Sequence, residues 1–122
     1  METPKIFESE YRFCLLLWEH EPVNSTKLAA LCKEQLGWSK ATTYTVIRRL
    51  GERGVRGVLK IEKATVTALI SREEAQTSRV EERVEQTFGG SIPAFIAAFG
   101  RSGKLSREDA AQLRAMIDAL ED

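Results

Sequence analysis

The sequence is poor in residues that build reactive or cross-linked sites. Its 122 residues include only two cysteines, one histidine and three prolines. Cys14 and Cys32 lie inside apolar helical patterns and belong to no CxxC or Cys/His cluster. We therefore expect two buried thiols that act as small hydrophobic side chains. We predict no disulfide framework, no metal site, no cofactor and no catalytic residues.

Long apolar runs are also missing. None approaches the roughly 18 residues that a membrane-spanning helix requires. The opening residues, METPKIFESEY, lack the hydrophobic region and the cleavage site of a secretion signal. We therefore expect a cytoplasmic protein that does not insert into a membrane.

The chain as a whole has no net charge, because 18 Lys and Arg side chains balance 18 acidic ones. The charge is nevertheless unevenly distributed. Residues 1–70 carry 11 basic against 8 acidic side chains, whereas residues 71–122 carry 7 against 10. The most basic stretch, residues 39–63, has 7 against 2, which is typical of an element that enters a DNA groove. A solvated surface would show the same charge, so this feature needs support from others.

Hydrophobic spacing predicts three helices in the first half of the chain. The first covers residues 8–21 with Ser9 as its N-cap. The second begins at Asn24 or Ser25 and ends at Gly37, and the third covers residues 39–53. So few residues join the last two that they must cross steeply, as in a helix-turn-helix. The apolar faces of the first two helices consist of Tyr11, Cys14, Leu15, Trp18, Leu28, Leu31, Cys32 and Leu36.

The pattern changes after the third helix. Residues 55–61 and 64–70 are short runs rich in Val, Ile and Thr around a polar turn at Glu62 and Lys63. Such runs predict a β-hairpin. A hairpin that follows a helix-turn-helix is a wing. The fold expected is mainly α with a small β-hairpin wing, in which residues 1–70 form a winged-helix domain.

Residues 71–122 predict three more helices, which begin near Ser71, Ser91 and Ser106. Ser71 and Glu74 form a capping box, and Gly89 and Gly90 end the first of these helices. A segment of this length cannot bury enough apolar surface by itself, so it should fold against the first domain or against a second copy. Its exposed apolar stripes favour the second copy, so we expect a helical dimerisation domain and a homodimer. The residues predicted at the dimer interface are Val80, Val84, Phe88, Ile92, Phe95, Ile96, Phe99, Leu105, Leu113, Met116, Ile117 and Leu120.

The third helix has two chemically distinct faces. Thr43, Val46, Ile47 and Leu50 form the face expected to pack on the preceding helices. Ala41, Tyr44, Thr45 and Arg48 form the opposite face, where an arginine can bind guanine or phosphate. The full set predicted to contact double-stranded DNA is Ser39, Lys40, Ala41, Thr42, Tyr44, Thr45, Arg48, Arg49, Lys60 and Lys63.

The sequence leaves two alternative function classes to compare, an enzyme and a protein-binding module. An enzyme has little support, because His20 lies at the end of a predicted helix between Glu19 and Glu21, and neither a phosphate-binding glycine loop nor a nucleophile motif is present. A winged-helix module that binds proteins and not DNA stays open, because the net charge is zero.

The segment GWSKATTYTVIRRL, residues 37–50, resembles the recognition-helix signature of the penicillinase repressor family. The resemblance extends to Glu10 and Trp18, to residues 69–75 and to residues 88–91. It therefore covers nearly the whole chain. The positions that match the signature are Trp38, Ser39, Thr42, Thr45, Arg49, Leu50, Arg53 and Gly54.

This resemblance implies a dimeric winged-helix repressor of a two-fold symmetric operator. In the β-lactam-responsive members, a membrane metallopeptidase sensor relieves repression and the repressor is cleaved. The equivalent bond here joins Ala98 and Phe99. The chain departs from the family in three ways: Ala98 replaces the Asn of cleaved members, the CxC motifs of copper-responsive members are absent, and the wing lacks the usual Gly-Arg and tyrosines.

Overall fold

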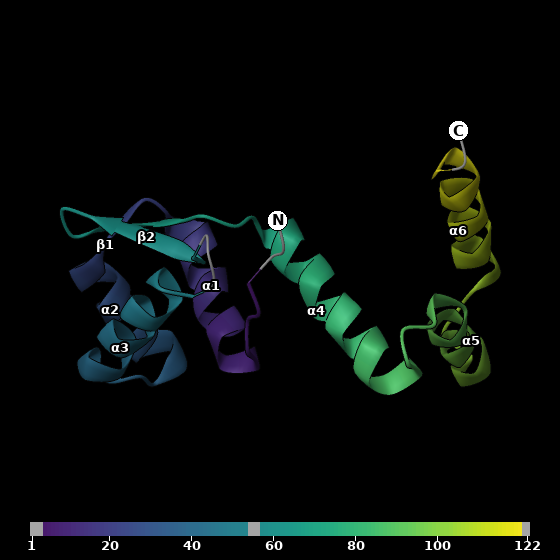
Figure 1. Ribbon diagram of the computed structural model, residues 1–122, viewed down its shortest axis with the longest axis horizontal. Coiled ribbons are helices and arrows are strands. Elements are labelled where there is room, and N and C mark those ends of the chain that lie inside the picture. Colours follow the sequence, from purple (N-terminus) through teal and green to yellow (C-terminus); the bar gives the residue numbers. More distant parts are fainter. Residues whose placement is uncertain (1–3, 54–56, 121–122) are drawn as a thin grey trace. The chain divides into compact units, whose positions relative to one another are not determined.

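The computed structural model describes residues 4–53 and 57–120 (Figure 1). It divides into two compact units, one ending at Val80 and the other beginning at Glu81. The boundary lies inside α4 (Arg72–Phe88), whose first turns belong to the N-terminal unit. The functional division after residue 70 stays a prediction.

The N-terminal unit combines helices with a small antiparallel sheet of strand order β1-β3-β2, as expected for a winged helix. The sheet lies along one side of α1, α2 and α3 (Figure 1). β1, a third strand, was not predicted. The elements before α4 are α1 (Glu8–His20), β1 (Val23–Asn24), α2 (Ser25–Leu36), α3 (Lys40–Gly51), β2 (Leu59–Glu62) and β3 (Thr65–Ala68).

The core of this unit is one cluster of apolar side chains from the three helices and the sheet. Cys14 and Cys32 are buried in it, which confirms the prediction for both thiols. The predicted apolar face of α1 was partly wrong. Of its four residues only Cys14 is buried, whereas Tyr11, Leu15 and Trp18 are half-buried at the edge. The buried side of α1 instead consists of Glu10, Phe13, Cys14, Leu16 and Leu17.

Local hydrogen bonds set the helix ends. Asn24 caps α2, because its side-chain oxygen accepts the amide of Thr26 at 2.8 Å. Gly37 ends that helix with φ of 71°, a left-handed conformation that glycine adopts without steric cost. Ser9 is not the cap of α1, which was predicted wrongly. The helix begins at Glu8, and the Glu10 carboxylate accepts the amide of Phe7 at 3.0 Å.

The hairpin was predicted correctly, but its turn lies one residue further along the chain. Glu62 pairs with Thr65, so Lys63 and Ala64 form the turn, with φ of 50° and 65°. The Ala64 carbonyl accepts the amide of Ser25 at 2.8 Å, which ties the turn to the start of α2. The predicted strand start at Val55 lies outside the described residues.

The C-terminal unit holds the second half of α4, α5 (Ile92–Ser102) and α6 (Arg107–Leu120). Their starts confirm the predicted caps, since Ser91 Oγ accepts the amide of Ala94 at 3.1 Å and Ser106 Oγ accepts that of Asp109 at 3.0 Å. The capping box of α4 is also present, with 3.0 Å for both bonds between Ser71 and Glu74.

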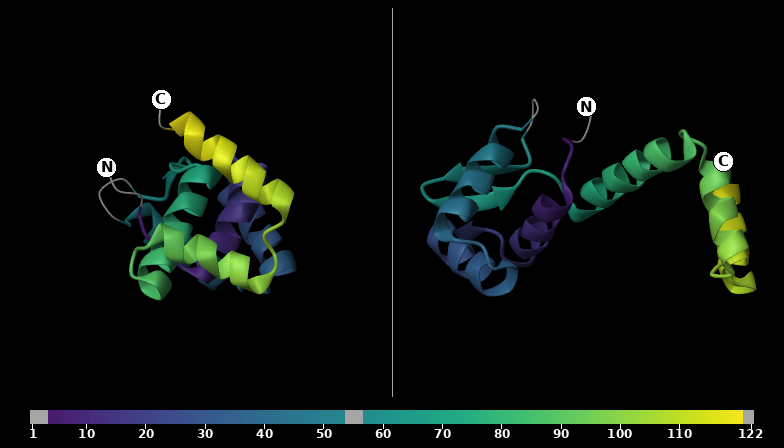
Figure 2. Two further views of the ribbon diagram at one scale, coloured as in Figure 1. Left: turned by 90° about the vertical axis from the view of Figure 1, so that its right-hand side faces the viewer. Right: turned by 90° about the horizontal axis from the view of Figure 1, so that it is seen from below.

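Few side chains of the C-terminal unit are removed from solvent. No residue of α5 or α6, both described in full, is buried. The two helices leave their connecting loop in diverging directions (Figure 2). The aromatic rings of this unit contact one another: Phe95 packs edge to face with Phe88 and with Phe99, with ring centroids 5.8 Å and 5.3 Å apart.

Candidate nucleic-acid interface

The two faces of α3 differ in burial as the sequence predicts. Thr43, Val46, Ile47 and Leu50 are buried against the core. On the other side Ala41, Thr45 and Arg48 are exposed, and Tyr44 is half-buried. α3 therefore presents a basic, hydroxyl-rich surface on a fixed core, which is the arrangement required to read the edges of bases.

Ser39 fixes the start of α3. Its Oγ accepts the amide of Thr42 at 3.1 Å and donates to the Thr42 hydroxyl at 2.9 Å. The Thr43 hydroxyl donates to the Ser39 carbonyl at 3.2 Å. Trp38, just before this cap, stacks on Phe13 with ring centroids 5.8 Å apart, so the short turn is anchored in the core. The helix N-terminus, with its partial positive charge, is thereby held in one place.

Tyr44 connects α3 to α2. Hydrogen bonds with Thr26 and then Ser25 lower the pKa of its hydroxyl, and nearby Lys40 adds to this effect. The Lys40 ammonium also lies over the Tyr44 ring, 5.8 Å from the centroid. The Tyr44 hydroxyl is therefore directed to the start of α2.

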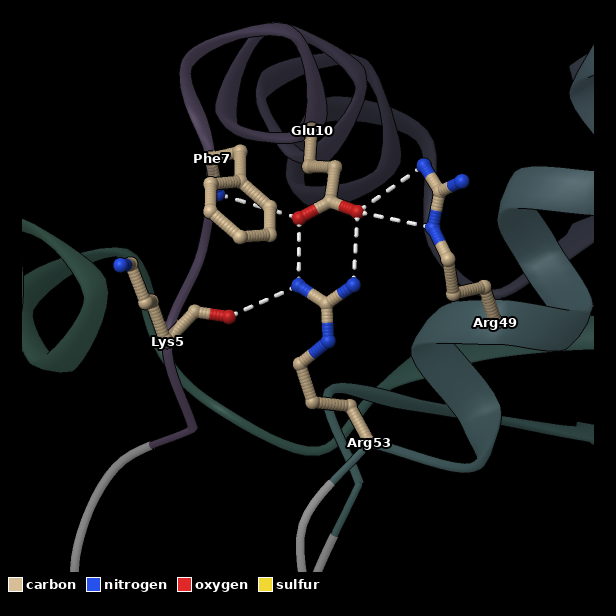
Figure 3. A network of polar contacts seen from close by, with 5 residues as sticks. All are labelled: Lys5, Phe7, Glu10, Arg49 and Arg53. Atoms are coloured by element: carbon tan, nitrogen blue, oxygen red, sulfur yellow. Dashed lines mark hydrogen bonds and ion pairs between the residues drawn. The ribbon is translucent and has the colours of Figure 1, made fainter.

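A buried carboxylate ties α1 to the end of α3 (Figure 3). The side chain of Glu10 is 1% exposed and binds two arginines. Arg53 contacts both carboxylate oxygens, at 2.5 Å and 2.9 Å, and also donates to the Lys5 carbonyl at 2.9 Å. Arg49 contacts one oxygen, from Nε at 3.1 Å and from Nη2 at 3.0 Å.

The charges around Glu10 determine its ionisation. Burial alone would raise the pKa of the carboxyl group, but this is outweighed by the bonds from Arg53, the Phe7 amide and Arg49 and by the charge of Arg53. The net effect is a lowered pKa. Glu10 is therefore an anion at neutral pH, bonded on both oxygens.

A hollow of about 380 Å³ lies beside the exposed face of α3. One wall comes from the first turn of α1 and another from the turn before α3. Among the described residues, its lining combines hydroxyls, an aromatic ring and one guanidinium, with no acidic side chain. The lining residues are Ser9, Trp38, Ala41, Thr42, Thr45, Val46 and Arg49.

The two wing lysines lie on the hairpin, away from α3 in the sequence. Lys60 is on β2 with its side chain 52% exposed, and its ammonium is 3.9 Å from the Glu62 carboxylate. Such an exposed pair contributes little to stability, so Lys60 keeps the freedom to move to another anion. Lys63 is exposed in the turn.

The residues predicted at the dimer interface lie on α4, α5 and α6, except Leu105 in the connecting loop. Val84 is buried within the chain, whereas several others expose large apolar side chains. The predicted cleavage bond, between Ala98 and Phe99, lies inside α5. The most exposed members of the set are Val80, Ile92, Phe99, Met116, Ile117 and Leu120.

Sequence reasoning missed the polar network around Glu10 and the contributions of Ser9 and Trp38 to the hollow. One signal was present: Glu10 falls at helical spacing with Phe13, Cys14 and Leu17, so it lies on the buried side of α1. A carboxylate in such a stripe requires a cationic partner. The partner itself comes from a distant part of the chain.

The described residues contain no group of three or more His, Cys, Asp or Glu side chains placed to hold a metal ion. Within that part of the chain no helix has the length and apolar character needed to cross a membrane. A profile of the family described as penicillinase repressor matches residues 6–119. A search of curated proteins found no match.

Proposed function

Because the chain belongs to the penicillinase repressor family, whose members are transcriptional regulators, we propose that it is a dimeric repressor that binds palindromic operator DNA through α3. The observation that carries the proposal is the surface of α3. Arg48 and Thr45 project from a helix whose other side is buried, and Ser39 and Tyr44 fix its orientation. This rigid support suits direct readout in the major groove.

The C-terminal unit supports the dimer. Ile92, Met116 and Ile117 are each more than half exposed, at 64%, 63% and 54%, and Leu120 is 84% exposed. Large apolar side chains that lack a core within their own unit gain about 25 cal/mol per Å² when a second copy covers them. We propose that the paired units hold two copies of α3 at the spacing of a two-fold symmetric operator.

Release of the operator is proposed to follow a signal from a membrane metallopeptidase, with cleavage between Ala98 and Phe99. Proteases prefer exposed, flexible segments, and this bond lies within α5. The helix must therefore unwind locally before it is cut. Cleavage there would separate α6 from the rest of the chain and weaken the dimer. Incubation with the membrane fraction of induced cells, followed by mass measurement, tests for this product.

Selection from a library of random DNA duplexes tests DNA binding. We expect enriched sequences with two-fold symmetry. Binding to them, measured by fluorescence anisotropy, should weaken steeply with salt because Lys and Arg side chains displace counterions from phosphates. Failure to enrich any sequence would contradict the proposal and favour the alternative, a winged-helix module that binds another protein.

A further inference from the structure

The two arginines that bind Glu10 have different surroundings. Arg53 is 17% exposed and contacts both carboxylate oxygens, so it supplies the charge that Glu10 needs. Its guanidinium also lies over the Phe7 ring, 5.2 Å from the centroid. Arg53 is thus the internal counterion of the buried carboxylate. The positive charge of Arg49 is then in excess.

Arg49 is oriented by Glu10 but still available to a partner. It contacts only Oε2 of Glu10, through Nε and Nη2, and its side chain is 51% exposed. The remaining nitrogen of the guanidinium points away from the carboxylate (Figure 3). A guanidinium has five N–H donors in a rigid plane, so fixing one edge also fixes the direction of the other.

Arg49 also lines the hollow beside α3, together with hydroxyl groups from two elements. Ser9 comes from α1, and Thr42 and Thr45 come from α3. A guanidinium surrounded by hydroxyls, with no carboxylate among the described lining residues, matches the oxygens of a phosphodiester. The hollow opens on the surface of α3 that faces DNA in the proposed function, so the anion expected there belongs to the DNA backbone.

We propose that this hollow binds a backbone phosphate of the DNA, with Arg49 and Ser9 as contacts and Glu10 as the residue that positions Arg49. The proposal rests on the proposed function. It adds α1 to the DNA-binding surface, which α3 and the wing otherwise make up. It also assigns an acidic residue a favourable role in binding a polyanion.

Removing Glu10 can distinguish a positioning role from a purely electrostatic one. If Glu10 acted only through its charge, its removal would make the unit more positive and tighten DNA binding. If it positions Arg49, its removal releases the guanidinium and weakens DNA binding. The two accounts therefore predict opposite signs for one substitution.

The first test compares Glu10→Gln with Glu8→Gln by anisotropy on the selected duplex. Glu8 is in the same turn of α1, is 72% exposed and pairs with Arg79, not with Arg49. We expect Glu8→Gln to tighten binding by roughly twofold through charge alone. We expect Glu10→Gln to weaken it by roughly fivefold or more, and tightening by both variants would overturn the positioning role.

A second pair of variants tests the phosphate contact even if Glu10→Gln does not fold. Arg49→Gln should weaken binding by about tenfold, equally for selected and unrelated duplexes, and reduce the slope of log affinity against log salt by about 1. Ser9→Asp puts an anion into the hollow and should weaken DNA binding more than Arg49→Gln does. An unchanged salt slope in Arg49→Gln would overturn the subsite.

A double variant tests whether Glu10 acts through Arg49. In the Arg49→Gln background, Glu10→Gln should cause no further loss of affinity. Equal losses in both backgrounds would overturn the coupling. Titration with inorganic phosphate is the last control, since saturable binding that Arg49→Gln abolishes would make this a site for free phosphate. Failure of the wild-type protein to bind any duplex would instead contradict the proposed function.

Discussion

Three arginines near the end of α3 have three different environments. Arg53 is mostly buried against Glu10, Arg49 shares Glu10 but is half exposed, and Arg48 is exposed. Moving a guanidinium requires more free energy when it is already hydrogen-bonded within the protein. The three side chains should therefore differ in how readily they can contact DNA. Arg53 stabilises the fold, Arg49 holds a fixed position, and Arg48 can adapt to a base edge.

Replacing Arg48 tests the base contact. Arg48→Ala should weaken binding to the selected operator by about 1–3 kcal/mol, because a bidentate contact to guanine is lost. Binding to unrelated duplexes should fall far less. Anisotropy with both duplexes measures the ratio, and circular dichroism checks the fold. An unchanged ratio in a folded variant would show that Arg48 does not read a base.

The buried thiol of Cys14 gives a prediction for high pH. Burial, helped by the negative charge of Glu10, raises the pKa of Cys14 from 9.0 to about 12. Below pH 9 the thiol is neutral in both states and its contribution is complete. Above pH 9 the unfolded chain ionises first, so stability falls by about 1.4 kcal/mol per pH unit until the folded pKa is reached.

Urea unfolding of the wild type and Cys14→Ala, at pH 8 and pH 10, measures this effect. The variant loses some stability at both pH values because it leaves a cavity. Its further loss between pH 8 and pH 10 should be smaller than that of the wild type. Equal losses would mean that Cys14 ionises as readily in the fold as in the unfolded chain.

At the scale of elements, the hairpin turn holds two residues in an unfavourable backbone conformation. Lys63 and Ala64 have φ of 50° and 65°, which side chains with a Cβ disfavour. Ala64→Gly should therefore raise the free energy of unfolding by about 1 kcal/mol. The control is Ala68→Gly in extended β3, which should lower it by a similar amount. Urea denaturation that showed loss in both variants would refute the turn geometry.

Elements were predictable where one short segment contains all the necessary interactions. Ser39, Ser71, Ser91 and Ser106 each bond to an amide three residues further along, so the four helix starts could be predicted from spacing alone. The division of α3 into two faces was equally local. Both features depend on helical periodicity and not on the rest of the fold.

Features that join distant segments were missed. β1 consists of Val23 and Asn24 only, and it is a strand because β3 pairs with it. Glu10 lies far from Arg49 and Arg53 in the sequence, so its partners could not be predicted from local spacing. The turn was predicted one residue too early, because it lacks the Asn or Gly that normally marks such turns. At the candidate interface, the basic face of α3 was predicted from the sequence. The wall that α1 contributes to the hollow was visible only in the structure.

At the scale of the whole molecule, the proposed function requires two copies of the chain on one operator. Ile117→Asp tests the dimer better than a change at Phe95, because Phe95 contacts Phe88 and Phe99 within its own unit. Ile117 is 54% exposed, so the charge should leave the unit folded and prevent pairing. Sedimentation equilibrium should show monomers, and affinity for the palindrome should fall by orders of magnitude as the linked second half-site is lost.

Ala115→Asp is the matched control. It introduces the same charge at an exposed position that helical periodicity places opposite Ile117 on α6. This variant should remain dimeric and bind the operator like the wild type. Dimers in both variants would show that α6 lies outside the interface.

The contrast between the two sides of α3 also bears on how such proteins diverge in evolution. Ala41, Thr45 and Arg48 are exposed, and substitutions at exposed positions usually change stability by less than about 0.5 kcal/mol. Thr43, Val46, Ile47 and Leu50 are held by the core. If the outer face reads DNA as proposed, one copy can acquire a new operator after gene duplication through a few changes on that face, while selection for folding preserves the inner one.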